Sequence, residues 1–343
     1  MSREFVTTGP RQIEIREVDE RPLAPEEVRV RSLLTTISHG TELALYRGTA
    51  PFATQRFDLE TRAFREEPGG TIYPFRLGSE FVGEVTEVGS EVVGVAVGDV
   101  VYGNGGHAHV QQLRADAVIP IAPGIDPERA LFVHHGCVAL NAIHDGALLV
   151  GDVVGVFGLG VIGLLTVQLA GLAGARTVYA ADPLAHRREL ALACGAADAF
   201  DSIAADAGLE MKTRAGAGVD VALEVSGTYR GLQDAIRSVR IGGRIVGGGY
   251  YQGGGEALRL GEEFLHNRVE LVSSMYVWEC PHRAHPRWDR ARLRETVFGL
   301  LASGALDVSR YVTDRIPWEE TAAAYRLLDE HPEQTVRVVI TYG

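Results

Sequence analysis

The chain has 343 residues, of which 46% are hydrophobic, and its formal net charge is −12 at pH 7. A chain of this length is expected to form two domains rather than one, and its acidic balance argues against nucleic acid and anionic membrane surfaces as partners. No apolar run approaches the roughly 18 residues that a membrane span requires. Residues 1–20 lack the apolar stretch of a signal peptide, so we expect a cytoplasmic protein.

The first third of the chain, up to about residue 122, predicts a compact β-rich unit. Strand-like alternation of apolar and polar residues occurs over 26–38, 80–92 and 99–113. The last of these stretches contains His107 and His109, whose spacing would suit a metal, although exposed alternation along a strand is the favoured explanation. Residues 50–74 show no clear periodicity, and we expect a long excursion or a lid-like loop there.

From about residue 128 the pattern changes to alternating strands and helices. One or two helices are expected within 128–148, followed by strands at 152–160, 176–182, 219–227 and 242–251, with helices at 161–174, 183–195 and 228–240 between them. This alternation predicts a parallel sheet covered by helices on both faces. After about residue 275 the pattern is mixed again, and the chain ends in a predicted helix, 319–331, and a predicted strand, 334–343.

The strongest functional signal is the stretch VVGVFGLGVIGLL, in which Gly158, Gly160 and Gly163 follow an apolar strand and open an apolar helix. Gly158 permits a tight turn, Gly160 lets the backbone approach a pyrophosphate, and Gly163 allows close packing of helix on strand. The helix start at Val161 and Ile162 favours the phosphate charge. The motif therefore predicts a dinucleotide site, with a tight turn that binds no ligand as the alternative.

The next predicted strand ends at Asp182, a position that bears on the choice of dinucleotide. A carboxylate there can accept hydrogen bonds from the adenosine ribose hydroxyls and would repel a 2′-phosphate, which favours NAD. The structural alternative for Asp182 is a helix N-cap before Pro183. Arg187 and Arg188 complicate the choice, since an arginine could accept the phosphate of NADP.

With these features the chain resembles the medium-chain dehydrogenase/reductase superfamily over nearly its whole length. The resemblance rests on HGTELALYRG (39–48), FRLGSEFVGEVTEVGSEV (75–92), VGDVV (97–101), GLGVIG (158–163) and EVSG (224–227). A narrower and less specific similarity links the C-terminal part to alcohol dehydrogenase-like members related to bacteriochlorophyllide dehydrogenases.

The resemblance implies an α/β fold in which a Rossmann dinucleotide-binding domain, 126–273, is inserted into a GroES-like β-rich catalytic domain made of 1–125 and 274–343. Members place the active site in the cleft between the domains and form dimers or tetramers, so we expect a homodimer or homotetramer that associates through the Rossmann domain. The implied cofactor-binding residues are Gly158, Gly160, Val161, Ile162, Gly163, Asp182, Arg187 and Ser226.

The zinc ligands of the superfamily are altered in this chain. Zinc-dependent members carry a cysteine at the start of the first motif, where this chain has His39, and a histidine in the second motif, where Ser79 precedes the retained Glu80. Counting back from the glycine motif places the third ligand position at Val133 or His134. A structural four-cysteine zinc site is excluded, because the chain has only three cysteines.

Two alternatives follow for the catalytic metal. The favoured one is an enzyme without catalytic zinc. The other is a rebuilt site in which His39, Glu80 and His134 supply two imidazoles and one carboxylate to the ion. In the superfamily the glutamate at the position of Glu80 often supports the metal site from behind rather than binding the ion.

Without zinc, the proton chemistry must come from side chains. Thr41 matches the Ser/Thr that contacts the alcohol oxygen in zinc alcohol dehydrogenases, but a hydroxyl alone is a weak base near neutral pH. His39 and His134 are candidate partners, since an imidazole titrates in this range. The predicted catalytic set is therefore His39, Thr41, Glu80 and His134, each with a structural role as its alternative. Cys137 aligns with a position facing the nicotinamide, where a small buried filler is the simpler interpretation.

The favoured function is an NAD-dependent dehydrogenase that interconverts a secondary alcohol and its ketone without catalytic zinc. The substrate would be a polyol, a sugar-derived compound or a specialised metabolite. A zinc-free NADPH-dependent quinone or enoyl reductase is one alternative, against which Asp182 argues. A dinucleotide-binding protein without catalytic activity is the other.

Overall fold

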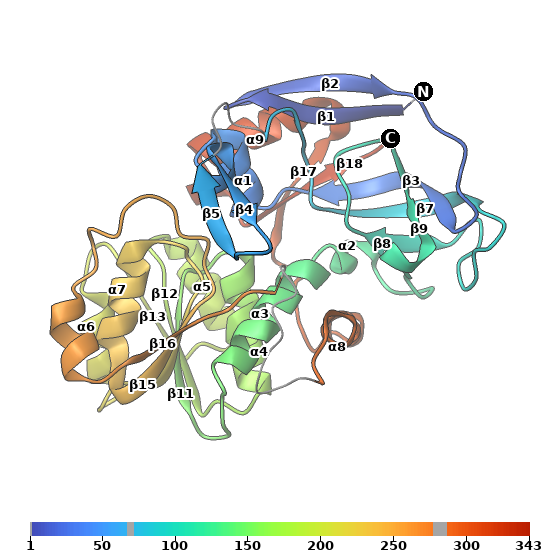
Figure 1. Cartoon of the computed structure of the whole chain (residues 1–343). Helices are drawn as coiled ribbons and strands as arrows, with labels where there is room; N and C mark the ends of the chain where they lie inside the picture. Colours follow the sequence, from blue (N-terminus) through green and yellow to red (C-terminus); the bar gives the residue numbers. More distant parts are fainter. Residues whose placement is uncertain (1, 67–71, 277–286) are drawn as a thin grey trace. The chain divides into compact units, whose positions relative to one another are not determined.

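The computed structural model describes residues 2–66, 72–276 and 287–343 (Figure 1). These residues form two compact units, one of Met1–Leu131 with Tyr311–Gly343 and the other of Phe132–Arg310. The first unit thus combines both ends of the chain, and the second is inserted between them. In the described part of the chain, no helix is both long enough and apolar enough to cross a membrane.

The first unit is built on a mixed sheet in the order β10-β8-β7-β3-β18-β17, with β9 also paired to β3. Its strands are β3 (Glu27–Thr36), β7 (Glu80–Val88), β8 (Val100–Gly103), β9 (Val110–Arg114), β10 (Val118–Pro120), β17 (Val312–Pro317) and β18 (Arg337–Thr341). A smaller sheet has the order β2-β1-β6, with strands β1 (Ser2–Gly9), β2 (Gln12–Val18) and β6 (Phe75–Arg76). The C-terminal strand β18 pairs antiparallel with β3, so the last strand of the chain shares a sheet with strands from its first third.

The helices of this unit pack a core at one end of the sheet. They are α1 (Thr41–Arg47), α2 (Pro127–Ala130) and α9 (Thr321–Glu330), with single turns at Pro51–Ala53, Ala115–Ala117, Trp318–Glu320 and Pro332–Gln334. Large apolar side chains from α1, α9, strand β1 and the turn Trp318–Glu320 form one core cluster, which includes Phe5, Leu43, Tyr46, Trp318 and Tyr325. A second cluster fills the interior of the sheet between β3, β7 and β8, where Val28, Phe81 and Val101 are fully buried.

The excursion at 50–74 contains a small hairpin of β4 (Gln55–Asp58) and β5 (Ala63–Glu66). The ring centroids of Phe57 and Phe64 lie 5.0 Å apart, and the Asp58 side chain accepts the turn amides of Glu60 and Thr61 at 3.0 and 2.9 Å. Most of the hairpin is exposed. Because it buries no face, its sequence carries no alternation, and this is why the strands were not predicted.

The second unit contains a six-stranded parallel sheet in the order β13-β12-β11-β14-β15-β16. Its strands are β11 (Val153–Phe157), β12 (Thr177–Ala181), β13 (Asp198–Phe200), β14 (Val219–Glu224), β15 (Val239–Gly247) and β16 (Glu270–Ser273). Its helices are α3 (Val133–Asp145), α4 (Val161–Leu172), α5 (Ala185–Ala193), α6 (Ala207–Arg214), α7 (Tyr229–Ser238) and α8 (Arg290–Ser303), with a short helical turn at Leu260–Phe264. The pair α3–α4 lies on one side of the sheet and the pair α6–α7 on the other (Figure 1), so the predicted α/β fold is confirmed.

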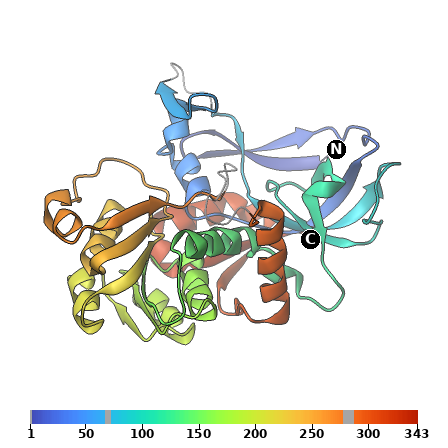
Figure 2. The same ribbon diagram turned by 60° about the horizontal axis from the view of Figure 1, so that its bottom comes forward.

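The compact units divide the chain at other points than the sequence suggested. The expected domains ended at residues 125 and 273, whereas the units end at Leu131 and Arg310. The difference at the second boundary comes from α8, which was not predicted and which lies beside α3 in both views (Figures 1 and 2). A Cβ on Gly136 of α3 would lie 2.5 Å from Cγ1 of Val297, so the glycine lets the two helices approach closely.

Candidate active site

Two close backbone contacts shape the glycine loop of the second unit. Gly158 has φ +89°, and a Cβ there would lie 2.6 Å from the backbone of Ser226. At Gly163 a Cβ would lie 1.8 Å from the carbonyl oxygen of Gly158. Neither position has room for a side chain, so the loop packs on the turn after β14 and on the first turn of α4.

Gly160 differs, because a Cβ there would meet no heavy atom within 4 Å. It is the N-cap of α4, and the first intrahelical bond runs from Leu164 N to its carbonyl. The amides of Val161, Ile162 and Gly163 therefore lie ahead of the helical ladder, next to open space. Such a helix start fits the pyrophosphate of a dinucleotide, which these amides and the glycine loop would hold.

The Asp182 carboxylate ties the glycine loop to the end of β12. Its Oδ2 accepts the Leu159 amide at 2.7 Å, its Oδ1 accepts the Leu184 amide at 2.9 Å, and the residue is only 4% exposed. The N-cap of α5 is Leu184, so Asp182 does not itself cap this helix. Each carboxylate oxygen keeps a second lone pair, so contact with a ribose remains chemically available.

The two arginines that complicated the cofactor prediction have different surroundings. Arg188 donates through Nη1 to the carbonyls of Asp182 and Pro183, both at 2.8 Å, and its Nη2 lies 3.1 Å from Asp201. It therefore holds the turn after β12. Burial lowers the pKa of Arg187, and the nearby Asp182 charge opposes this shift. Both arginines therefore lie close to Asp182, Arg188 through its backbone carbonyl and Arg187 through the charge of its carboxylate.

Ser226 is exposed, but it belongs to a polar group around the buried Glu224, of which only Ser226 was predicted. Its amide donates to Oε1 of Glu224 at 2.8 Å, its hydroxyl donates to the same atom, and Tyr251 donates to Oε2. Burial raises the pKa of Glu224. The group joins the turn after β14 to the loop after β15. The sequence offered one signal for it, the carboxylate of Glu224 within the apolar stretch VDVALEVSG.

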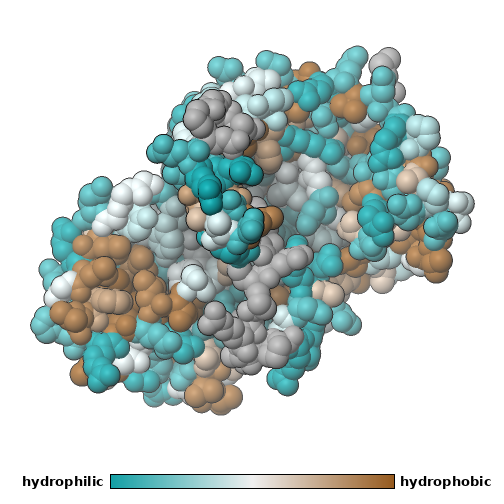
Figure 3. All heavy atoms as spheres, viewed as in Figure 1, coloured by the Kyte–Doolittle hydropathy of each residue, from teal (hydrophilic) through white to brown (hydrophobic). Residues whose placement is uncertain are grey.

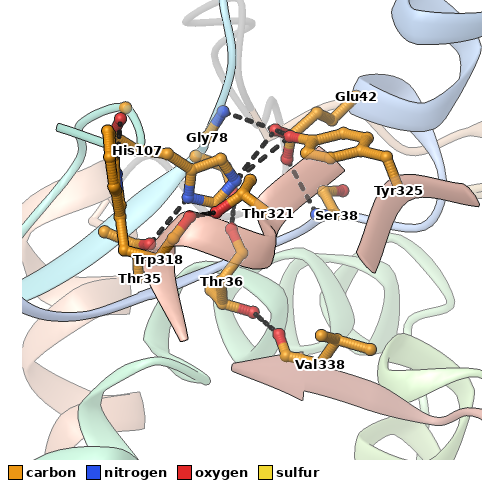
Figure 4. Close-up of polar contacts among 12 residues, drawn as sticks. Thr35, Thr36, Ser38, Glu42, Gly78, His107, Trp318, Thr321, Tyr325 and Val338 are labelled. Atoms are coloured by element: carbon orange, nitrogen blue, oxygen red, sulfur yellow. Dashed lines mark hydrogen bonds and ion pairs between the residues drawn. The ribbon is translucent and has the colours of Figure 1, made fainter. Parts of the chain in front are cut away.

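In the first unit, Glu42 connects the two segments that carry predicted catalytic residues (Figure 4). It lies in the first turn of α1, beside Thr41 and after the turn that contains His39, and it is 4% exposed. Its Oε2 accepts the Ser38 amide at 2.9 Å, and its Oε1 accepts the Gly78 amide. Sequence analysis missed this role, since nothing in the local pattern shows what a buried glutamate contacts.

Glu80, the retained glutamate, is fully buried at the start of β7. Its Oε2 accepts Arg337 Nη2 at 2.8 Å, and its Oε1 accepts the Tyr102 hydroxyl at 2.9 Å. Its neighbour Ser79 donates through its hydroxyl to the Thr36 carbonyl at 3.4 Å. Glu80 thus occupies an anchoring position in the sheet.

His107 corrects the expectation of exposed alternation at 107 and 109. It is fully buried, its Nδ1 lies 2.6 Å from the Thr35 hydroxyl, and its Nε2 lies 3.1 Å from the Tyr325 hydroxyl. Burial lowers its pKa to about 3. The ring of His109 packs against Trp318 with centroids 4.2 Å apart. The expectation was wrong for His107, because this residue lies in the bend before β9, where its ring contacts Thr35 and Tyr325.

His134 lies near the start of α3 in the second unit, with its ring centroid 5.5 Å from that of Tyr276. Cys137, one turn along, is fully buried and forms a hydrogen bond with the Tyr276 hydroxyl, so a packing role accounts for it. The guanidinium carbon of Arg290 lies over the Tyr276 ring, 5.4 Å from its centroid. The side chain next to His134 is therefore a buried phenol, whose pKa burial raises.

The residues of the first unit are a poor match to the rebuilt zinc site. The ligand Glu80 already pairs with a guanidinium, which would be forced close to a divalent cation. Ser79 offers a hydroxyl in place of an imidazole, and hydroxyls are poor zinc ligands. Across residues 2–66, 72–276 and 287–343, no group of three or more His, Cys, Asp or Glu side chains is arranged to hold a metal ion.

The chain is similar to known proteins in both sequence and fold. Residues 25–141 match the alcohol dehydrogenase GroES-like domain, and residues 161–287 match the zinc-binding dehydrogenase domain. The chain is 33% identical over 350 residues to the D-guloside 3-dehydrogenases of Escherichia coli (strain K12) and Shigella flexneri, across 99% of this chain and 100% of theirs.

Solved structures show the same fold. The 2R,3R-butanediol dehydrogenase of Bacillus subtilis superposes with a TM-score of 0.80 over 99% of both chains, at 23% identity. A putative zinc-binding dehydrogenase of Sinorhizobium meliloti, solved with NADP, gives 0.79 over 99% of both chains, at 24% identity. The chain belongs to the alcohol dehydrogenase-like, zinc-binding dehydrogenase family of the medium-chain dehydrogenase/reductase superfamily.

Proposed function

We propose that this protein is an NAD-dependent dehydrogenase that oxidises a secondary hydroxyl of a sugar-derived substrate, such as a glycoside, to a ketone. The observation that carries this proposal is the full-length similarity to D-guloside 3-dehydrogenases, at 33% identity over 99% of the chain. Enzymes named for butanediol, threonine and sorbitol are also similar to this chain, and all of these substrates contain a secondary hydroxyl.

Asp182 supports NAD over NADP as the cofactor. Its carboxylate lies at the end of β12 and is bonded to the glycine loop, where a 2′-phosphate would bring negative charge toward a buried anion. Arg187 lies close enough to offset part of that repulsion, so the discrimination should be strong without being absolute. Bound NAD would accept the hydride from the carbinol carbon.

The chain's own residues must then remove the hydroxyl proton. We assign this step to Thr41, whose hydroxyl would pass the proton to His39 in the preceding turn, and His134 of the second unit stays a predicted catalytic residue. Glu80 would act behind them as a sheet anchor, since both of its oxygens accept hydrogen bonds. This scheme uses no zinc, because side chains alone move the proton in it.

A substrate screen tests the proposal. The purified protein is incubated with NAD and methyl glycosides of several hexoses, polyols and simple secondary alcohols, and the absorbance of reduced nicotinamide is followed. Turnover of a glycoside with a ketone product supports the proposal. Reduction of quinones or enones with NADPH, or binding of NAD without turnover of any alcohol, would contradict it.

We also propose that the protein is a homodimer or homotetramer joined through the second unit. Strand β16 is the edge of the parallel sheet, and Leu271 on it is 43% exposed, with Leu265 just before it 65% exposed. Figure 3 shows an apolar area on this unit. An exposed apolar edge strand is protected when a second copy covers it. A monomeric mass by light scattering at micromolar concentration would refute this assembly.

A further inference from the structure

A chain of buried polar side chains lies behind Glu42 in the first unit (Figure 4). Tyr325 of α9 donates to Oε1 of Glu42, and its hydroxyl lies 3.1 Å from Nε2 of His107. The other ring nitrogen lies 2.6 Å from the Thr35 hydroxyl, which in turn lies 3.2 Å from the Tyr342 hydroxyl. These five residues come from separate elements and form one continuous series of hydrogen bonds.

The protonation state of His107 fixes the direction of this series. Its pKa of about 3 makes it a neutral imidazole, with one donor and one acceptor nitrogen. Because Tyr325 donates its proton to Glu42, its oxygen accepts from Nε2–H of His107. Nδ1 then accepts from Thr35, and Thr35 accepts from Tyr342. Every donor in the series is therefore oriented toward the Glu42 carboxylate.

The Glu42 carboxylate also accepts hydrogen bonds from two backbone amides. The Ser38 amide directly precedes the turn with His39, and the Gly78 amide directly precedes Ser79. The N-cap of α1, Gly40, makes no side-chain capping bond, and a Cβ on it would meet no heavy atom within 4 Å. The space beside Gly40 is therefore open, and the Ser38 amide bond to Glu42 is one contact that holds this turn.

The other segment is held against the same histidine. The His107 amide donates to the Leu77 carbonyl at 2.7 Å. Gly78 has φ +104°, and a Cβ there would lie 2.5 Å from the His107 nitrogen. The backbone before β7 is therefore fixed from one side by His107 and from the other by Glu42, while Glu42 is fixed by Tyr325.

We propose that Glu42, supported by Tyr325 and His107, is a positioning clamp that sets the distance between the 38–41 turn and the 78–80 segment. By holding both amides the clamp directs Thr41 and His39 at the substrate hydroxyl. The inference rests on the proposed function for the identity of the reaction, but the clamp itself is a property of the first unit. Proton transfer from the substrate hydroxyl to Thr41 and His39 requires these side chains to be placed within a fraction of an ångström. Loosening the clamp should therefore slow turnover.

The test compares two variants on the same helix. Tyr325→Phe keeps the ring and removes the hydroxyl that holds Glu42. Asp329→Asn, one turn along α9, weakens the contact to the far end of α1, where Arg47 Nε lies 2.5 Å from the carboxylate. We expect Tyr325→Phe to lower kcat on the order of tenfold with the Kd for NAD unchanged, and Asp329→Asn to leave kcat unchanged even if Tm falls.

Amide hydrogen exchange supplies a readout that needs no substrate. Exchange should speed up at 38–41 and 77–80 in Tyr325→Phe and stay at the wild-type rate there in Asp329→Asn. If Tyr325→Phe fails to fold, Thr35→Val removes a more distant hydroxyl and should produce a smaller change of the same kind. Unchanged exchange in the variant that folds, or faster exchange without loss of kcat, would overturn the clamp. If the wild-type protein is inactive on every alcohol, the proposed function is wrong. The exchange data would still decide whether Glu42 holds both segments.

Discussion

Arg337 and Glu80 form an ion pair of 2.8 Å in which the two side chains are 1% and 0% exposed. Removing one member of such a pair leaves a buried charge without its counter-ion. We predict that Arg337→Met lowers the free energy of unfolding by about 3–5 kcal/mol. Urea denaturation measures this loss. The double variant Arg337→Met/Glu80→Leu should recover much of it, and a double variant no more stable than the single would contradict the interpretation.

The same ion pair bears on the metal. Purified protein should contain well under one equivalent of zinc, and chelators should leave turnover unchanged, because Glu80 is committed to Arg337 and Tyr102. Elemental analysis measures the content, and a well-characterised zinc alcohol dehydrogenase treated in parallel is the control. One tightly held zinc that His39→Ala or His134→Ala releases would establish the rebuilt site instead.

The imidazole of His39 should carry the pH dependence of turnover. We predict that His39→Ala lowers kcat by about 10²–10⁴, the usual contribution of a positioned acid or base, and removes the limb of the pH–rate profile near pH 6–7. NAD binding should persist. His331→Ala changes a half-exposed histidine outside the proposed centre and is the control. An unaltered pH profile in His39→Ala would exclude this histidine as the relay.

Asp182 should affect both the choice of cofactor and how firmly the glycine loop is held. We predict at least about tenfold preference for NAD over NADP, which corresponds to roughly 1.4 kcal/mol. Asp182→Ala should narrow this gap and weaken both cofactors, because the Leu159 amide loses its acceptor. Fluorescence titration gives both Kd values, with Asp198→Asn as a control carboxylate on β13. Equal use of the two cofactors by the unmutated protein would refute the role of Asp182.

Asp234 on α7 predicts a pH-dependent stability. Burial raises its pKa from 3.8 to about 6, with Asp206 adding to the rise and Arg230 and Arg237 opposing it. Between pH 3.8 and about pH 6, Asp234 is ionised in the unfolded chain but still protonated in the folded unit. The folded unit therefore loses stability as pH rises through this range, and the loss is complete above about pH 6. Asp234→Asn should therefore raise Tm at about pH 8 and have little effect at about pH 4. A gain of equal size at both values would point to a cause other than ionisation.

Much of the second unit was predictable because its signals are local. Each apolar strand and each amphipathic helix is defined by residues close in the chain, and the glycine motif of 158–163 lies within one strand–turn–helix unit. The expected boundary after residue 273 differs from the end of the second unit at Arg310, because α8 packs on α3, which lies about 150 residues earlier. The two strands of the hairpin at 55–66 were not predicted, because the hairpin buries no face and its sequence carries no alternation.

The sequence by itself determined the superfamily, the α/β architecture and the dinucleotide cradle, and it exposed the altered ligand at Ser79. Only the tertiary structure decided that Glu80 pairs with Arg337, that His107 is buried, and that Glu42 joins the 38–41 turn to the 78–80 segment. The physical reason is distance along the chain. Periodicity and turn chemistry are properties of neighbouring residues, whereas the partner of a buried charge depends on which remote strands and helices the folded sheet brings within hydrogen-bond distance.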